Sequence, residues 1–409
     1  MMQDRDLFAL ALGLSKPWYV AGVEFEPEKK RLELQIDFER GGTFVCPECG
    51  TAGCKAYDTQ EKTWQHLNFF QYKTELRARM PRVTCGGKCQ GLKPVEAPWA
   101  RAGSGFTLLF EALVMTMAAH MPVRAIARLL GVTDMRLWRV IEYYVEHARG
   151  RRDDGEVRRV GIDETSRRRG HDYISVFMDL DRARVLYVTE GKDASTVSRF
   201  AEDLEAHGGS AEQIEEVCVD MSAAFIKGVE EALPEASITF DKFHVMKLMG
   251  DAVDKTRRDE RASHPELKGQ RHALLRNPET MSESQFDFVS SLLLTQTAPK
   301  TARAFHLKLS FAEFWHQPKR QAASYLKKWY SWAVRSRVPA MITAAKTIKQ
   351  HWDGVLRWFT SHITNGLLEG MNSLIQSAKR RARGFSTTRN LANIIYLIAG
   401  KLDLRLTHL

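Results

Sequence analysis

The chain has 409 residues, of which 44% are hydrophobic and 27% are charged, a balance that excludes a disordered or fibrous chain and allows two to four folded domains. Its 60 Lys and Arg outnumber its 50 Asp and Glu, and the net charge of +10 favours nucleic acid or an anionic membrane surface as a partner. No apolar run approaches the roughly 18 residues of a membrane span, and acids stand at the N-terminus where a signal peptide needs cations. We therefore expect a cytoplasmic protein that does not enter a membrane.

Residues 1–98 are expected to form an N-terminal region that contains a zinc ribbon. A short helix over residues 4–14 precedes two alternating segments at 18–26 and 31–39, which predict a β-hairpin. Five of the six cysteines then fall between residues 46 and 89. In a cytoplasmic protein such clustering indicates metal ligation rather than disulfide bonds.

Two cysteine pairs in this region have the spacing of a tetrahedral zinc site. The pairs read CPEC and CGGKC, and 35 residues separate them. The proline and glycines beside the sulfurs suit turns that let backbone amides approach the thiolates. Cys54 is a substitute ligand and His66 a weaker one, and the alternative is a set of unrelated reduced cysteines. The predicted structural Zn²⁺ ligands are Cys46, Cys49, Cys85 and Cys89.

Residues 106–150 are predicted to form a helix-turn-helix DNA-binding domain. Within them, segment 122–148 carries apolar residues on two successive helices, with Gly131 at the turn between them. Arg136 and Arg139 of the second helix would point away from the packed face, toward a DNA groove. An ordinary helical hairpin is the alternative.

Residues 157–249 alternate in the order strand, strand, strand, helix, strand, helix, strand, helix, which predicts an α/β sheet with helices on both sides. Asp163 and Asp220 each fall where a strand is expected to end, and ligand sites of such sheets gather at strand ends. Each aspartate has a simpler interpretation as the cap of a turn. Asp241 and His244 have two interpretations. Either they contact and orient the metal-binding side chains without binding the metal themselves, or they serve as a helix cap and a core histidine.

Residues 250–360 show helical spacings and no convincing strand, so we expect an all-helical insertion. Residues 361–409 hold the final helices, and the helix predicted within 365–385 is stopped by Gly384. Its expected core face consists of Leu367, Met371, Leu374, Ala378 and Ala382. Its expected polar face consists of Asn365, Glu369, Asn372, Gln376, Lys379, Arg380 and Arg383. A solvated basic helix is the alternative.

Three carboxylates suit a site for two divalent cations. Oxygen ligands favour Mg²⁺ or Mn²⁺, and two such ions about 4 Å apart promote displacement at a phosphodiester without a covalent protein nucleophile. Asp163 and Asp220 would supply two of the ligands and Glu369 the third. Asn365 and Asn372 flank the glutamate on one helix face, where we expect them to position water or phosphate.

The succession of motifs resembles the DDE transposases of bacterial insertion sequences, specifically the ISL3 family. The shared features are CPxCG, a helix-turn-helix, GIDE, VCVDMS, DKFHV, NGLLEGMNS and KRRARGF. The resemblance implies an RNase H-like catalytic domain interrupted by a helical insertion, with Asp163, Asp220 and Glu369 as the catalytic acids. The sequence departs from the family in the spacing of the second cysteine pair, and at Gln376, where a lysine is frequent.

The resemblance also implies a reaction in two steps. Water first cleaves the phosphodiester at an element end, and the 3′-hydroxyl so formed then attacks target DNA. The zinc ribbon and helix-turn-helix would recognise terminal inverted repeats, at least a dimer would be needed to join two ends, and the protein would associate with the nucleoid. A non-catalytic DNA-binding regulator and a nuclease that never joins strands are the alternatives. The expected contacts to double-stranded DNA are Arg136, Arg139, Lys379, Arg380, Arg381 and Arg383.

Overall fold

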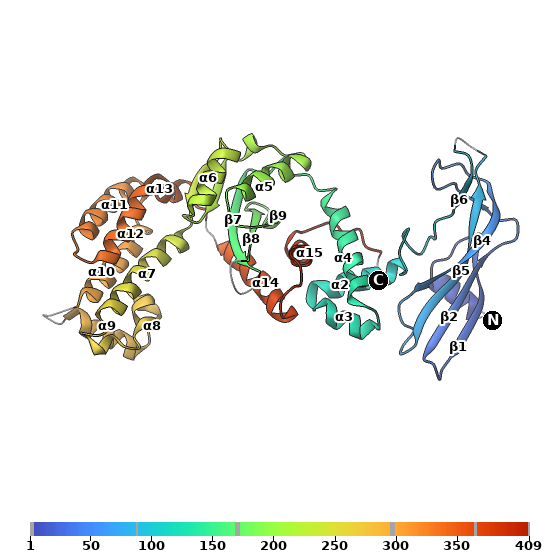
Figure 1. Cartoon of the computed structure of the whole chain (residues 1–409), viewed down its shortest axis with the longest axis horizontal. Helices are drawn as coiled ribbons and strands as arrows, with labels where there is room; N and C mark the ends of the chain where they lie inside the picture. The colour runs from blue at the N-terminus through green and yellow to red at the C-terminus, as the bar shows by residue number, and fades with distance from the viewer. Residues whose placement is uncertain (1–3, 87–88, 168–171, 295–298, 364–365, 408–409) are drawn as a thin grey trace. The chain divides into compact units, whose positions relative to one another are not determined.

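The computed structural model describes residues 4–86, 89–167, 172–294, 299–363 and 366–407. The chain divides into two units, each with its own core (Figure 1). Unit 1 comprises Met1–Ala148 and Asp403–Leu409, and unit 2 comprises Arg149–Leu402.

Unit 1 begins with a helix and a six-stranded sheet. The predicted hairpin is confirmed, because β1 and β2 pair antiparallel from Trp18 opposite Phe38 to Glu26 opposite Arg31. The sheet order is β1-β2-β5-β4-β3, with β6 on β5. Its core is built on Leu34, Ile36 and Leu76. The elements are α1 (Asp4–Ala11), β1 (Trp18–Glu26), β2 (Arg31–Phe38), β3 (Thr43–Phe44), β4 (Cys54–Gln65), β5 (Lys73–Thr84) and β6 (Leu92–Pro94).

Three helices follow in unit 1: α2 (Leu108–His120), α3 (Val123–Leu130) and α4 (Asp134–Arg149). Gly131 ends α3 with φ of 65°, a left-handed conformation that glycine adopts without steric cost. Ile126 of α3 and Leu137 of α4 are fully buried, so the two helices share one apolar core across this turn. The structure therefore has the helix, tight turn and helix that the sequence predicted.

Unit 2 contains a five-stranded sheet of order β11-β10-β7-β8-β9. β10 lies parallel to both β7 and β11, whereas β7, β8 and β9 pair antiparallel in succession. The predicted alternation of strands and helices is confirmed. The elements are β7 (Arg159–Ser166), β8 (Tyr173–Asp179), β9 (Arg184–Glu190), α5 (Ser195–Ala206), β10 (Glu216–Val219), α6 (Ala223–Ala232), β11 (Ser237–Phe240) and α7 (Lys242–Glu260).

The expected end of the first strand of unit 2 was wrong. β7 does not stop at its acids but continues to Ser166, so Asp163 lies within the strand rather than at its end. β8 is the cause, because it pairs with β7 along the whole length, with Asp163 opposite Val176 and Ser166 opposite Tyr173.

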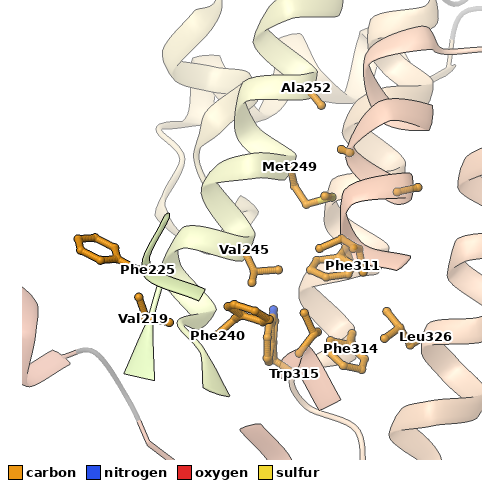
Figure 2. Close-up of a cluster of buried hydrophobic side chains, with 14 of the residues drawn as sticks. Val219, Phe225, Phe240, Val245, Met249, Ala252, Phe311, Phe314, Trp315 and Leu326 are labelled. Atoms are coloured by element: carbon orange, nitrogen blue, oxygen red, sulfur yellow. The ribbon is translucent and has the colours of Figure 1, made fainter. Parts of the chain in front are cut away.

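Residues 250–360 contain no strand among those described, as predicted. α7 runs from the sheet into these helices, and Figure 2 shows Val245 and Met249 of α7 packed among Phe240 of β11 and the side chains of Phe311 and Trp315. The sheet and the helices therefore share one hydrophobic core. The helices are α8 (Arg271–Leu275), α9 (Glu283–Leu294), α10 (Lys300–Phe314), α11 (Lys319–Val334), α12 (Pro339–Gln350) and α13 (Trp352–Ser361). Short 3₁₀ turns lie at Ala211–Gln213, Pro265–Leu267 and Pro278–Thr280.

The last two helices, α14 (Gly366–Ala382) and α15 (Thr388–Ala399), return to the sheet. α15 packs beside β9, where the Val188 backbone N–H donates to the Tyr396 hydroxyl at 2.9 Å. α14 lies along β7 and brings the C-terminal polar residues to the middle of the sheet.

Candidate active site and metal centre

α14 and β7 run side by side in the same direction. Four residues on one side of α14 meet β7 in the same order along both elements. Four helix residues advance about 6 Å and two strand residues advance about 6.5 Å, so the first three pairs stay in step. The pairs are Leu368 with Gly161, Asn372 with Asp163, Gln376 with Thr165, and Lys379 with the carbonyl of Ser166.

Gly161 permits this close approach. A Cβ atom at that position would lie 2.9 Å from Leu368 Cδ1 and 2.8 Å from Leu180 Cδ2, nearer than real Cβ contacts occur. The glycine of the GIDE motif is therefore required by the packing of α14 on the strand. The sequence contained this signal, but it does not reveal which helix packs there.

The expected core face of this helix was partly wrong. Leu374 is 39% exposed, and the buried residues of α14 are Leu368, Ile375 and Ala378. β7 offers α14 a carboxylate, a hydroxyl and a carbonyl, so the amides of Asn372 and Gln376 turn toward the strand. The helix also ends one residue earlier than predicted, since Arg383 already has φ of 57° ahead of Gly384.

The strand register brings Asp163 and Asp220 to the same level. Cys218 of β10 pairs with Gly161 of β7, and each aspartate lies two residues further along its own strand direction. Asp220 directly follows the end of β10, and its negative charge acts on Asp163, so the two carboxylates lie within electrostatic reach of each other. Asp220 also accepts a hydrogen bond from the Ser222 backbone N–H at 2.9 Å, which is the turn role considered for it.

The Asp163 carboxylate is held in a partly buried site. One oxygen accepts from the Glu164 backbone N–H at 2.7 Å, and the other accepts from the Asn372 side-chain amide. Burial raises the pKa of Asp163 to about 6, and the negative charge of Asp220 acts in the same direction, against the two hydrogen bonds and His244. A cation at this position would relieve that cost.

Asp241 has the helix-cap role considered for it, whereas His244 is half-buried rather than a core histidine. Asp241 caps α7 by accepting from the Phe243 N–H at 3.0 Å and the His244 N–H at 3.2 Å. Its carboxylate also lies 2.8 Å from His244 Nδ1. This hydrogen bond raises the pKa of His244, and the charges of Asp163 and Asp220 raise it further, which places the imidazole within electrostatic reach of both acids.

Glu369 is exposed on α14, one turn before Asn372. Residues three apart on a helix are neighbours with Cβ atoms about 5–6 Å apart, so the glutamate lies on the part of α14 that meets Asp163. The three acids do not converge to within 4.8 Å, a spacing that only the cysteines reach among the described residues. Asn365 lies outside the described residues.

The four predicted cysteines form one cluster. Their sulfur atoms all lie within 4.8 Å of one another, with Cys46 and Cys89 at 3.3 Å and Cys49 and Cys85 at 3.5 Å. A regular ZnS₄ tetrahedron with bonds of about 2.3 Å has sulfurs about 3.8 Å apart, so this set fits Zn²⁺. Thr51 hydrogen-bonds Cys49 and lowers the pKa of that thiol to about 5, which favours the ligating thiolate.

Neither substitute ligand belongs to the cluster. The Cys54 thiol donates to the Thr51 carbonyl at 3.4 Å. His66 Nδ1 lies 2.9 Å from the Thr107 hydroxyl, and burial lowers the pKa of His66 to about 4. The histidine is thus a neutral structural group beside the start of α2.

The predicted DNA-contact residues differ in their surroundings. Arg136 stacks its guanidinium 4.1 Å from the Phe106 ring centre and donates to the Gly105 carbonyl at 3.4 Å, whereas Arg139 is exposed on α4. Lys379 donates to the Ser166 carbonyl, and burial lowers its pKa. The exposed cations at the end of α14 are Arg380, Arg381 and Arg383.

No described helix has the length and apolar character needed to cross a membrane.

Three family models match successive parts of the chain. They describe a zinc-finger of transposase IS204/IS1001/IS1096/IS1165 at residues 42–89, a helix-turn-helix domain of transposase family ISL3 at 95–145, and an ISL3 transposase domain at 160–395.

Two curated relatives match nearly the whole chain. The transposase for insertion sequence element IS1557 of Mycobacterium tuberculosis is 29% identical over 97% of this chain and 96% of its own length. The transposase for insertion sequence element IS1001 of Bordetella parapertussis is 26% identical over 94% and 95%. Because the transposase domain match alone covers more than half of the residues, this chain belongs to the ISL3 family of insertion-sequence transposases.

Proposed function

We propose that this transposase cleaves and joins DNA with Asp163, Asp220 and Glu369 as its catalytic acids. The observation that carries the proposal is the pairing of α14 with β7. It sets Glu369 one helical turn from Asn372, whose amide holds Asp163, while the β7–β10 register brings Asp220 level with Asp163. Three acids from distant parts of the sequence are thereby directed to one face of the sheet.

The strand arrangement supports an RNase H-like core. Three antiparallel strands, β7, β8 and β9, precede two strands that join the other edge of β7 in parallel orientation. The first strand is central in that order, and it carries the first acid. Helices α7 to α13 fall between the second acid, which follows β10, and the helix that carries the third, which suits an insertion into the core.

The donor set fits Mg²⁺ or Mn²⁺. All three side chains offer hard carboxylate oxygens, and a bound cation would offset the burial that raises the pKa of Asp163 and so would further stabilise its charged form. When bound, two such ions lower the barrier by stabilising the attacking and leaving oxygens of the phosphodiester. Glu369 is exposed and free of the core, so a rotation of its side chain would bring its carboxylate toward the aspartates.

The remaining residues of the site position these acids. Asn372 holds one oxygen of Asp163, and the Glu164 backbone N–H holds the other. The Asp241–His244 pair holds an imidazole near the acids, and the hydrogen bond from Asp241 raises the pKa of His244, which favours a hydrogen bond from the ring to a phosphate oxygen of the scissile group. Asn365, as the preceding residue on the predicted polar face, would act on the same substrate.

We further propose that unit 1 recognises the terminal inverted repeats. Arg139 would reach the DNA from α4, while Arg136 would make phosphate contact beside Phe106. The cations at the end of α14 (Lys379, Arg380, Arg381 and Arg383) would follow the DNA leaving the site, with Lys379 exchanging its carbonyl partner for phosphate. Joining two ends would require at least a dimer.

The test is incubation of the protein with labelled terminal-repeat DNA, unlabelled target DNA and Mg²⁺. We expect nicked repeat ends first and joined products afterwards, and neither without a divalent metal. Cleavage without joining would identify a nuclease. Specific binding without cleavage in either Mg²⁺ or Mn²⁺ would contradict the proposal and identify a DNA-binding regulator.

A further inference from the structure

The part of the chain between Glu313 and Asp353 carries cations but no acid. It spans the end of α10, all of α11 and all of α12. Every lysine and arginine in it is exposed. We call this set the α11–α12 basic face; its members are Lys319, Arg320, Lys327, Lys328, Arg335, Arg337, Lys346 and Lys349.

Half of this face forms a single row along α11. Three of its members on α11 and a fourth at the C-cap of that helix fall, at 100° per residue, within an arc of about 100° and extend over about 22 Å of helix axis, whereas Lys319 lies outside this arc. The opposite side of α11 is buried at Ala322, Leu326, Trp329 and Ala333. The row consists of Arg320, Lys327, Lys328 and Arg335.

Hydrogen bonds hold the row in a fixed position. The Trp329 indole N–H donates to the Leu307 carbonyl at 2.9 Å, and the Tyr325 hydroxyl donates to the Ser310 carbonyl at 2.7 Å, so both bonds tie α11 to α10. Arg303 donates to the Ser336 carbonyl at 2.7 Å and secures the turn between α11 and α12. The cations are therefore presented by a rigid surface rather than by a loose segment.

These charges lack the partners that other cations of unit 2 have. Among the described residues, none of the eight lies within 4.0 Å of a carboxylate oxygen. By contrast, Lys227 pairs with Glu231 at 3.7 Å and Lys255 pairs with Asp259 at 3.3 Å. The four like charges of the row along α11 repel one another, and a polyanion would remove that repulsion.

We propose that the α11–α12 basic face binds the phosphate backbone of double-stranded DNA. The choice of DNA rests on the proposed function, because a transposase must hold both an element end and its target. A membrane surface is a poorer fit, since a membrane-binding helix exposes its apolar side, and that of α11 is buried. Trp332, 41% exposed at the edge of the row, adds an apolar side chain that would pack against the sugars of the duplex backbone.

The face is a further DNA contact, in addition to those proposed for α4 and for the end of α14. It is formed by the helices between α7 and α14, where the sequence predicted an all-helical insertion. A straight row of cations on a rigid helix suits contacts to successive phosphates, which hold DNA without reading its sequence. The insertion would therefore add affinity and not specificity.

The test compares two variants with the same change in net charge. The first replaces the row, as Arg320→Gln, Lys327→Gln, Lys328→Gln and Arg335→Gln. The matched control replaces four cations of unit 2 that have acidic partners, as Lys227→Gln, Lys255→Gln, Arg258→Gln and Arg271→Gln. Binding of a fluorescent, mixed-sequence DNA duplex is measured by anisotropy over a range of salt concentrations, without added Mg²⁺.

For the row variant we expect binding at least about tenfold weaker than that of the unmodified protein. The slope of log affinity against log salt concentration should become less negative by about 3 to 4, because each of the four lost phosphate contacts contributes about 0.9 to that slope. The control should change the slope by less than about 1. Equal losses in the two variants would show an effect of net charge alone and overturn the proposal. Binding of the unmodified protein to phosphatidylglycerol vesicles, but not to the duplex, would also overturn the proposal.

A second measurement uses the unmodified protein and does not depend on the folding of any variant. Lysine acetylation is followed by mass spectrometry with and without the duplex. We expect protection of Lys327, Lys328 and Lys346, with Lys227 and Lys255 as unprotected references. Equal reactivity with and without DNA would overturn the proposal. Because both measurements report binding without metal, their results do not depend on whether the three acids catalyse cleavage.

Discussion

The Asn372 side-chain amide of α14 donates a hydrogen bond to the Asp163 carboxylate of β7 across 209 residues of sequence. This contact joins the last helix of the site to the central strand of the sheet. It also sets the rotation of α14, because Leu368 and Gln376, one turn to either side of Asn372, meet β7 at Gly161 and Thr165. The position of Glu369 follows from that rotation.

Replacing Asn372 with Ala should slow DNA cleavage by about 10- to 100-fold, because a hydrogen bond to a charged group contributes about 1.5–3 kcal/mol. DNA affinity should change little, since the amide faces Asp163. Single-turnover cleavage and anisotropy binding measure the two effects. Ser373→Ala, at the exposed neighbouring position, is the control. Equal cleavage rates for these two variants would show that the amide does not position Asp163.

Gly161→Ala should destabilise unit 2 by about 1–3 kcal/mol, as overpacking commonly does, and should also reduce cleavage because α14 must shift. The added Cβ would meet Leu368 and Leu180. In a Leu368→Ala background the same change should be less destabilising, because one of the two obstructing side chains is shortened. Denaturant unfolding of the four proteins measures this coupling. A strictly additive result would mean that Leu368 does not obstruct position 161.

Cys46→Ser should remove about one equivalent of zinc and lower the thermal midpoint of unfolding, because three thiolates bind zinc less tightly than four. Cys54→Ser is a matched control, since Cys54 is equally buried and lies in the same region but outside the cluster. Metal analysis after dialysis and a thermal melt are sufficient. Zinc loss from the Cys54 variant, or retention by the Cys46 variant, would contradict the assigned ligands.

His66 should make the stability of unit 1 depend on pH. Burial lowers the pKa of His66 to about 4, whereas an exposed histidine titrates near 6.5. Between these values the unfolded chain binds more protons, so the free energy of unfolding falls as the pH drops from about 6.5 to about 4, by at most about 3 kcal/mol. The ring is partly exposed, so the measured change should be smaller.

His66→Gln removes the titrating group and keeps a polar side chain near Thr107. The difference in unfolding free energy between this variant and the unmodified protein isolates the histidine from acid release of zinc, which affects both proteins. We expect the unmodified protein to lose more unfolding free energy than the His66→Gln variant as the pH falls. A difference that is constant from pH 7 to pH 4.5 would mean that the histidine is not held neutral.

Much of this arrangement could be predicted from the sequence because it depends on local patterns. Cysteine spacing located the zinc ligands, and the turn glycine at position 131 located the helix-turn-helix. The alternation of apolar and polar residues gave the order of strands and helices in unit 2. Each of these features is encoded within a few tens of residues.

The remainder depends on partners that are distant in sequence. The length of β7 depends on its pairing with β8, so the end of the strand could not be read from GIDE alone. The buried side of α14 depends on the polar groups that β7 offers, so an apolar stripe misplaced Leu374. The contact of Lys379 with the Ser166 carbonyl could not be foreseen either, because the two residues lie 213 positions apart in the sequence.

The central claim is that Glu369 completes a metal-binding set with Asp163 and Asp220. The most direct measurement is single-turnover cleavage of labelled terminal-repeat DNA in Mg²⁺ by Glu369→Gln, with DNA binding measured on the same samples and Glu313→Gln, an exposed glutamate of α10, as the control. We predict a loss of about a thousandfold or more for Glu369→Gln, the equivalent of several kcal/mol of transition-state stabilisation, with binding unchanged. Cleavage within about threefold of the Glu313→Gln control would contradict the claim.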